Sequence, residues 1–187
     1  ALGRKSIFTF TKEPDTMTIH HSHSTPVASK GKPRRILFIC YGNICRSVAA
    51  QAVFAQMARH AGVSALFDAD SAATSAEELG NAIYPPMKSA LVSRGYALPS
   101  HQARQATRAD CERSDYIVCA DRANVSAMRR IAGSGQDEKI SLLLSWAGRN
   151  AEVADPWYTR DFIAALDDIE EGCEALLKAL LHGENKR

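Results

Sequence analysis

Short apolar runs that alternate with segments of helical spacing constrain the fold of this chain more than any other feature. The first run, ILFIC at residues 36–40, is apolar throughout, as is typical of a strand buried on both faces of a parallel sheet. The segment after it places apolar side chains at i, i+3, i+4 and i+7 from Ala50 onward, and Gly62 supplies a helix stop. The chain therefore begins its folded part with a strand followed by a helix.

The same alternation continues to the end of the chain. It predicts an α/β fold with three layers, in which a doubly wound sheet of four parallel strands is flanked by helices in a flavodoxin-like arrangement. In such a sheet the ligand lies beyond the carboxyl ends of the strands. Beyond the first pair, we expect strands at residues 66–75, 115–120 and 139–144, and helices at residues 85–95, after Thr107, after Asp121 and over residues 162–180.

The first 33 residues differ in composition from the rest of the chain. They mix Ser, Thr, His, Pro and Lys with almost no apolar periodicity, so we expect residues 1–33 to form a flexible leader. The cluster of His20, His21 and His23 has no cysteine or carboxylate at ligand spacing, which favours a solvated tail over a metal site. Residues 34–187 are then one domain, long enough to bury a core.

Charge and cysteine content exclude several functional classes. The chain has 23 Lys and Arg against 21 Asp and Glu, a formal net charge of +2, which does not favour nucleic acid or an anionic membrane surface as a partner. Five cysteines, an odd number in a chain of 187 residues, do not suggest a secreted disulfide scaffold, so we expect a cytoplasmic location. Nothing in the sequence indicates an oligomeric state.

The segment CYGNICRS, residues 40–47, joins the first expected strand to the first expected helix. Such junctions often wrap an anion, because backbone N–H groups converge there with the helix dipole behind them. A metal site would need two further ligands, and no second Cys or His pair has zinc-like spacing. A Walker loop would need GKS or GKT. Two interpretations remain, a structural turn or a cysteine nucleophile in an anion cradle.

The second interpretation gives each residue of the segment a chemical task. Arg46 can clamp two oxygens of a tetrahedral oxyanion, and a thiol beside an arginine at a helix N-terminus is stabilised as the nucleophilic thiolate. Gly42 allows close backbone approach and a positive φ, and Asn43 tolerates a left-handed conformation. Ser47 can donate a hydrogen bond to the sulfur of Cys40. By composition alone, each of these residues is more often simply part of an ordinary turn.

The segment, after ILFI and before AVF, resembles the phosphate-binding loop of the low-molecular-weight protein tyrosine phosphatases. Other segments resemble that family in the same order, and together they cover nearly all of residues 34–181. The matching segments are CYGNICRS (40–47), DSAATS (70–75), GYALPSHQARQ (95–105), SDYIVCAD (114–121) and DPWY (155–158).

The resemblance implies a cysteine-dependent phosphatase that acts on phosphotyrosine proteins and small aryl phosphates, without metal or cofactor. Cys40 would attack phosphorus and form a phosphocysteine, Asp155 would serve as general acid and then general base, and Arg46 would stabilise the phosphoryl oxygens. Without the family, Asp155 followed by a proline would be taken for a turn or cap residue. The phosphate-binding loop would then comprise Tyr41, Gly42, Asn43, Ile44, Cys45 and Ser47.

Further roles follow from the same resemblance. Ser71 and His101 would join Asn43 in a hydrogen-bond network that holds the loop. Cys45 would trap an oxidised Cys40 as a disulfide. Trp157 and Tyr158 would form a wall of the substrate cleft and stack on a phenyl ring. The remaining cysteines are expected to be buried packing residues: Cys111, Cys119 and Cys173.

Several positions depart from the family pattern. Tyr41 stands where many members have a smaller or aliphatic residue, Val48 replaces a proline, and Gln51 stands where glutamate is common. Glu77 and Glu78 occupy a loop where members often place an aromatic residue, so we expect an acidic second wall of the cleft and a preference for basic neighbours of the phosphotyrosine.

Three alternatives use the same loop. Thioredoxin-coupled arsenate reductases share the fold, but they need two more cysteines on a mobile segment, and Cys119 lies within an apolar strand. Protein-arginine phosphatases tend to have threonine at the position of Ile44, so the isoleucine favours phosphotyrosine. A phosphate-binding module without catalysis is hard to reconcile with the presence of Cys40, Arg46 and Asp155.

Overall fold

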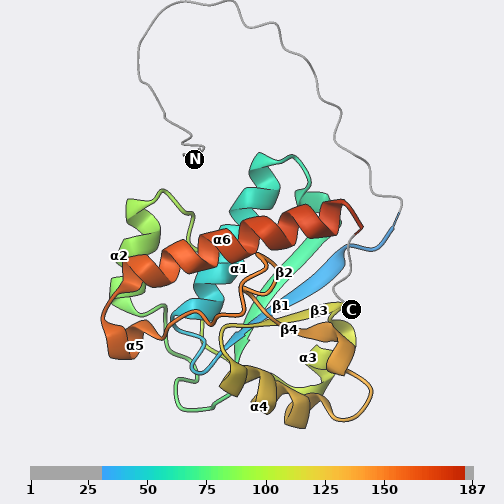
Figure 1. The fold of residues 1–187 in the computed structure, drawn as a ribbon. Helices are drawn as coiled ribbons and strands as arrows, with labels where there is room; N and C mark the ends of the chain where they lie inside the picture. The colour runs from blue at the N-terminus through green and yellow to red at the C-terminus, as the bar shows by residue number, and fades with distance from the viewer. Residues whose placement is uncertain (1–30, 184–187) are drawn as a thin grey trace, which may run out of the picture.

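The computed structural model describes residues 31–183 (Figure 1). The greater part of the expected leader, with its histidine cluster, lies outside the described residues. No helix among the described residues is long and apolar enough to cross a membrane. The elements are β1 (Arg34–Cys40), α1 (Arg46–His60), β2 (Phe67–Ala73), α2 (Pro85–Ser93), α3 (Arg108–Arg113), β3 (Tyr116–Cys119), α4 (Arg122–Ala132), β4 (Ile140–Leu142), α5 (Pro156–Thr159) and α6 (Phe162–Leu181).

The four strands form one parallel sheet in the order β2-β1-β3-β4. This confirms the predicted four-stranded α/β fold. The chain moves from β1 to β2 on one side and then crosses to β3 on the other, so the winding direction changes between β1 and β3. Ligands of open α/β sheets bind at such a switch point, beyond the carboxyl ends of the strands. Cys40, the last residue of β1, lies at this point.

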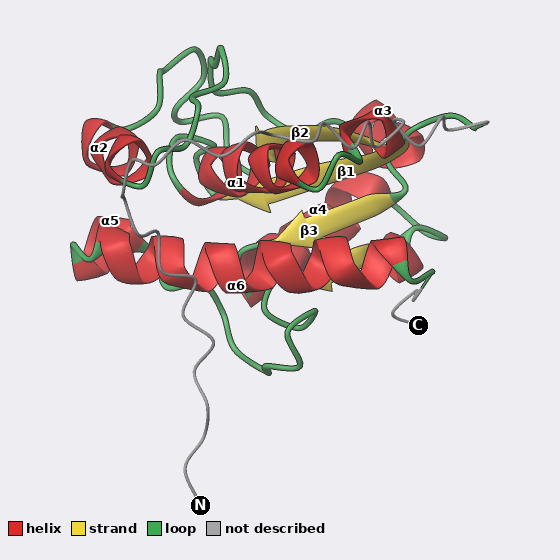
Figure 2. Ribbon diagram, turned by 90° about the horizontal axis from the view of Figure 1, so that it is seen from above, coloured by secondary structure: helices red, strands yellow, loops and turns green. Residues whose placement is uncertain are grey.

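Helices cover both faces of the sheet (Figures 1 and 2). Alternate side chains of β1 point to opposite faces, as the two-residue period of a strand requires. Ile36 and Phe38 pack with α1, α2 and α6 in the larger apolar cluster, whereas Leu37 and Ile39 pack with α3 and α4 in the smaller one. Burial on both faces explains why β1 is apolar along its whole central run.

Two expected helix starts are confirmed by their caps. The side chain of Thr107 accepts a hydrogen bond from the backbone N–H of Asp110, and the carboxylate of Asp110 accepts one in return from the Thr107 backbone. Asp121 and Asn124 form the same reciprocal pair at the start of α4. Each pair satisfies two backbone N–H groups that a helix start would leave without partners.

The strand expected at residues 139–144 is shorter in the structure. β4 ends at Leu142, and the next residues form tight turns in which the Ser145 N–H donates to the Leu142 carbonyl. Leu143 and Leu144 are nevertheless buried. An apolar run records burial and not backbone conformation, so it could not distinguish a strand from a buried turn.

Candidate active site

The loop between β1 and α1 surrounds the sulfur of Cys40. Cys40 is only 2% exposed. Its Sγ accepts a hydrogen bond from the backbone N–H of Asn43 at 3.2 Å and lies 3.0 Å from the Ser47 Oγ. Within the described part of the chain, the backbone N–H groups of Gly42, Ile44 and Cys45 donate to no protein acceptor. The loop therefore has the donors that an oxyanion requires.

The backbone of the loop is left-handed at one residue, Asn43, with φ +59°. This confirms the expectation for the asparagine. The expectation that Gly42 also takes a positive φ is wrong, since its φ lies outside that region. An added Cβ at residue 42 would lie 3.0 Å from the Glu78 Cγ, so the Glu78 side chain would have to move by a few tenths of an ångström. This contact comes from a neighbouring loop and not from the turn itself.

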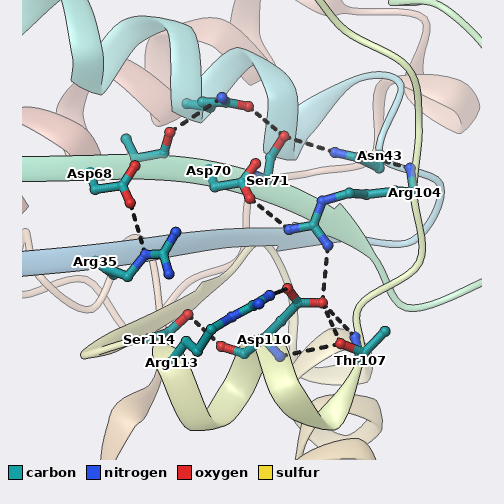
Figure 3. A network of polar contacts seen from close by, with 12 residues as sticks. Arg35, Asn43, Asp68, Asp70, Ser71, Arg104, Thr107, Asp110, Arg113 and Ser114 are labelled. Atoms are coloured by element: carbon teal, nitrogen blue, oxygen red, sulfur yellow. Dashed lines mark hydrogen bonds and ion pairs between the residues drawn. The ribbon is translucent and has the colours of Figure 1, made fainter.

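The side chain of Asn43 is fully buried and links the loop to β2 and α1 (Figure 3). Its Nδ2 donates to the Ser47 Oγ at 3.0 Å and to the Ser71 Oγ at 2.9 Å. Since Ser47 accepts from Asn43, its own hydroxyl proton is free to point at the Cys40 sulfur. The structure thus brings Ser71 to Asn43 as expected, and it adds Ser47 to the same network.

His101 holds the other side of the same asparagine. Its Nε2 lies 2.6 Å from the backbone carbonyl oxygen of Asn43, which can only accept, so Nε2 carries the proton. Burial lowers the pKa of His101, and the hydrogen bond to Asn43 offsets only part of that effect. The ring is therefore neutral at pH 7 and acts as a fixed donor.

Arg46 is the first residue of α1, and its guanidinium is held by two carboxylates. Its Nη1 donates to Asp121 at 2.7 Å, and its Nη2 donates to Asp155 at 2.6 Å. The side chain is 3% exposed. Burial alone would lower the pKa of Arg46, but interactions with Cys40, Asp155 and Asp121 raise it. The guanidinium therefore stays positively charged.

Asp155 precedes α5 and caps it. One carboxylate oxygen accepts a hydrogen bond from the Trp157 backbone N–H at 3.0 Å, and the other contacts Arg46. Asp155 can therefore be a helix cap and a catalytic acid at once, because the hydrogen bond from Trp157 orients its carboxylate. The carboxylate remains partly exposed at the edge of the loop.

A pocket of about 440 Å³ opens over this loop. Cys40, Arg46 and Asp155 all line it, and Trp157 and Tyr158 supply a wall from α5. The Trp157 ring packs against Tyr84 with ring centroids 5.4 Å apart, which fixes its position while leaving 46% of the residue exposed. The remaining lining residues are Tyr41, Gly42, Ile44, Cys45, Glu77, Glu78, Asp121, Ala123 and Asn124.

Comparison with known proteins identifies the family. The family model described as low molecular weight phosphotyrosine protein phosphatase matches residues 35–186. A low molecular weight protein-tyrosine-phosphatase of Streptomyces coelicolor is 38% identical over 153 residues, which cover 78% of this chain and 93% of that protein. The Bacillus subtilis protein YfkJ, of the same description, is 34% identical over 147 residues, covering 78% and 94%.

The crystal structure of YfkJ superposes with a TM-score of 0.80 at 32% sequence identity, and covers 83% of this chain and 99% of that one. The chain belongs to the low molecular weight phosphotyrosine protein phosphatase family. The resemblance seen in the sequence and the predicted fold class are both confirmed.

Relative to the family pattern described above, this phosphatase has an acidic rim on its pocket. The Tyr41 hydroxyl donates to a Glu77 carboxylate oxygen at 2.6 Å, and both residues are exposed. The Asn81 amide donates to Glu78 at 2.6 Å. Among the described residues, neither glutamate forms an ion pair with a cation. The second wall is thus acidic, as expected.

The cysteines of the phosphatase are all buried free thiols in the structure. Burial, with the nearby Cys40 adding to it, raises the pKa of Cys45 to about 12. Cys119 and Cys173 lie in the two apolar clusters, and burial raises the pKa of each. Among residues 31–183, no three His, Cys, Asp or Glu side chains are placed to hold a metal ion.

Sequence reasoning missed several residues that this phosphatase uses around the loop. It assigned Asp121 only as a helix cap, although the same carboxylate binds Arg46. Asp121 follows the carboxyl end of β3, the neighbour of β1, and that position was a usable signal. Gln51 supports the same network, because its Oε1 accepts a hydrogen bond from the Ser71 hydroxyl at 2.6 Å. The residues next to it in the sequence do not indicate this contact.

Proposed function

We propose that this family member hydrolyses phosphotyrosine in proteins, and small aryl phosphates, with Cys40 as nucleophile, Arg46 as phosphate clamp and Asp155 as general acid and base. The observation that carries the proposal is the sulfur of Cys40, which receives hydrogen bonds at the base of a pocket that Arg46 and Asp155 also line. The thiolate is the nucleophilic form, and donors aimed at the sulfur stabilise it.

In the first step the Cys40 thiolate attacks phosphorus in line, and the bond from phosphorus to the aryl oxygen breaks. Asp155 enters this step in its protonated form, released by Arg46, and gives its proton to that oxygen, so the phenol leaves neutral. Arg46 turns from its carboxylate partners to two phosphoryl oxygens, and the backbone N–H groups of the loop hold the others. The product of this step is a phosphocysteine.

In the second step a water attacks the phosphocysteine and transfers a proton to the Asp155 carboxylate. The bond between phosphorus and sulfur breaks, and inorganic phosphate forms. The hydroxyl of Ser47, 3.0 Å from the sulfur, stabilises the departing thiolate. Cys40 and Asp155 return to the states in which they began.

The aromatic wall supports an aryl substrate. Trp157 and Tyr158 are exposed at the pocket, so a phenyl ring can stack there while its phosphate reaches the loop. We expect phosphoserine to be a poorer substrate, because its side chain is shorter and has no ring to stack on this wall. Phosphotyrosine proteins are therefore the proposed substrate class, as the names of the relatives state for those proteins.

The test compares wild type, Cys40→Ser and Asp155→Ala on aryl phosphates with phenols of different acidity, and uses vanadate as inhibitor. Cys40→Ser should lose all turnover and still bind phosphate. Asp155→Ala should lower kcat by about 10²- to 10⁴-fold, most strongly for the least acidic phenols. Asp121→Ala is the matched control, because Asp121 also contacts Arg46 but donates no proton in this scheme. Equal leaving-group dependence in the two aspartate variants contradicts the assignment of Asp155.

The alternative activities receive less support from the geometry. A thioredoxin-coupled arsenate reductase needs accessible relay thiols, whereas Cys111 and Cys119 are both 0% exposed and have raised pKa values because of burial. We expect no arsenate-dependent consumption of reduced thioredoxin. We also expect hydrolysis of phosphotyrosine to exceed that of phosphoarginine, since Ile44 presents an aliphatic side chain to the pocket.

We further propose that residues 34–187 form the catalytic domain and that residues 1–33 take no part in catalysis. β1 begins at Arg34 and the family match begins at residue 35, which supports this boundary. A chain shortened to residues 34–187 should keep the kcat and KM of the full chain on aryl phosphates. A loss of activity at unchanged folding would assign the first 33 residues a role.

A further inference from the structure

We propose that Arg104 is a positioning residue for the phosphate-binding loop. Its side chain is clamped between Asp70 and Asp110, and this clamp keeps its backbone N–H on the side-chain oxygen of Asn43 (Figure 3). The inference rests on the proposed function, because it describes how the attacking sulfur of Cys40 is supported.

The backbone N–H of Arg104 decides which way the Asn43 amide faces. It donates to the Asn43 Oδ1 at 3.1 Å, and an N–H can be accepted there only by oxygen, not by the amide nitrogen. Nδ2 must then face Ser47 and Ser71 as a donor. A flipped amide would place its NH₂ group against the Arg104 N–H and leave two donors face to face in a buried site.

The orientation of Asn43 is transmitted to the sulfur. Because Ser47 accepts from the Asn43 Nδ2, it keeps its hydroxyl proton for Cys40, 3.0 Å away. Four groups therefore form one directed series of hydrogen bonds, which runs from the Arg104 N–H through Asn43 and Ser47 to the Cys40 sulfur. Polar chains of this kind are strong only when each member is held in place.

The side chain of Arg104 fixes the first donor of this series of hydrogen bonds, its own backbone N–H. Its Nη2 contacts Asp70 at 2.7 Å, and its Nη1 contacts Asp110 at 3.0 Å. Asp70 immediately precedes Ser71 in β2, and Asp110 lies in α3, so the guanidinium joins two elements behind the loop. The Arg104 carbonyl also accepts from the Ala73 N–H at 2.8 Å, which ties the same residue to the end of β2.

Asp110 is itself a rigid partner. Its carboxylate accepts hydrogen bonds from the Thr107 backbone N–H and hydroxyl at 2.8 and 2.7 Å, and Arg113 contacts it at 2.8 Å. The side chain is 8% exposed. Asp110 is thus held in place by Thr107 and Arg113, and it fixes the Arg104 side chain in turn. This makes the ion pairs of Arg104 suitable for positioning the Asn43 amide.

The chain offers a matched control for this role. Arg35 also forms an ion pair with an aspartate of β2, Asp68, at 2.8 Å, and its side chain is 37% exposed against 35% for Arg104. Figure 3 shows the two arginines beside the same strand, but only Arg104 reaches Asn43. Arg35→Met therefore removes a comparable ion pair without touching that series of hydrogen bonds.

The experiment measures aryl phosphate kinetics and the pH dependence of Cys40 alkylation by iodoacetate in Arg104→Met, Arg104→Lys and Arg35→Met. Arg104→Met should lower kcat about tenfold with KM within about twofold, as expected for a misplaced catalytic group. The midpoint of alkylation should move to higher pH, since Ser47 then donates less well to the thiolate. Arg104→Lys should recover part of both effects, and Arg35→Met should show neither.

Two results would overturn the proposal. The first is that the two Met variants behave alike, and the second is that Arg104→Met lowers thermal stability but leaves kcat and the alkylation midpoint unchanged. Should Arg104→Met fail to fold, Arg104→Lys against Arg35→Met decides the question. Failure of the proposed function can be told apart from failure of this proposal. If the wild type has no hydrolytic activity, the pH dependence of Cys40 alkylation can still be measured, and that measurement alone then tests the role of Arg104.

Discussion

The two sides of the loop at residues 40–47 differ in how they are built. The pocket side carries exposed aromatic and acidic side chains, including Tyr41, Glu77 and Trp157. The supporting side is closed, and each polar atom of the buried Asn43 side chain has a partner. The difference indicates a division of labour, in which precision at the sulfur comes from the buried side and recognition of the substrate from the exposed side.

The comparison leads to a general expectation about substitutions. Changes on the supporting side should lower kcat and stability together, because they leave buried polar groups without partners. Changes on the pocket side should alter KM or selectivity and leave the fold intact, since exposed contacts contribute little to stability. Arg46 belongs to both sides, and its substitution should have the largest effect.

Arg46→Lys should lower kcat/KM on aryl phosphates by roughly 10²- to 10³-fold, the usual loss for one oxyanion-stabilising group. Lysine keeps the charge but cannot bind two oxygens, or the two carboxylates of Asp121 and Asp155, in the same fork. Steady-state kinetics checks this. Retention of more than about a tenth of the wild-type kcat/KM would show that charge alone suffices.

Asn43→Ala tests the supporting side. We expect kcat to fall about 10²-fold through misplacement of the loop. The melting temperature should drop by roughly 4–10 °C, because Ser47, Ser71 and the Arg104 N–H lose a buried partner and a left-handed alanine is strained. Kinetics and calorimetry measure the two effects. Asn81→Ala, which removes an exposed asparagine side chain that contacts Glu78, should change the melting temperature by less than about 2 °C.

Asp110→Asn tests the acid resistance of the supporting side. Burial would raise the pKa of Asp110, but hydrogen bonds from Thr107 and Arg104 outweigh it and lower the pKa to about 2. A lowered pKa contributes stability that is present above about pH 4 and is lost as the pH falls through about 2. The variant should be less stable than wild type by on the order of 1–2 kcal/mol at pH 7, with the difference shrinking as the pH falls from about 4 through about 2.

Urea unfolding at several pH values measures that difference. Glu112→Gln is the control on the same helix, since its ion pair with Arg108 is exposed and should contribute only about 0.3–0.5 kcal/mol. A difference between Asp110→Asn and wild type that persists unchanged at pH 2 would mean that the carboxylate is not what stabilises the clamp.

Trp157→Ala tests the aromatic wall of the pocket. Loss of one aromatic contact should raise KM for aryl phosphates about two- to tenfold, with little change in the melting temperature. Inhibition by inorganic phosphate is the internal control, because phosphate binds the loop and not the wall. Equal weakening of phosphate and aryl phosphate would mean that Trp157 supports the loop instead of the ring.

Glu77→Gln tests the acidic rim and should have the smallest effect. We expect the ratio of kcat/KM for peptides with lysine beside the phosphotyrosine to that for peptides with glutamate to fall about two- to fivefold, as for an exposed ion pair. The ratio should also fall with added salt. Glu174→Gln, exposed on α6, is the control of equal charge. An unchanged ratio in Glu77→Gln removes the rim from substrate selection.

Much of the fold follows from local pattern. The apolar run of β1, the caps at Thr107 and Asp121, and the apolar stripe of α6 each predicted an element that the structure contains. The end of β4 and the short helix α5 escaped prediction. Both depend on how the chain turns after a buried segment, which burial patterns do not encode.

The candidate site divides in the same way. The loop motif and the resemblance to the family indicated Cys40, Arg46 and Asp155, and the structure lines one pocket with all three. Arg104 gave no such indication of its contact with Asn43, and for Asp121 only its position after β3 indicated that it lies near the site. Their partners are distant in sequence, with Arg46 and Asp121 separated by 75 positions and Asn43 and Arg104 by 61.

The sequence by itself determined the alternation of strands and helices, the loop at the end of the first strand and the left-handed asparagine within it. These depend on the conformational preferences and burial of neighbouring residues. Tertiary structure alone decided which carboxylates hold Arg46, which side chain packs against Gly42 and which arginine orients the Asn43 amide. Those choices depend on which strand ends and loops meet in space, and local preference carries no information about partners so far along the chain.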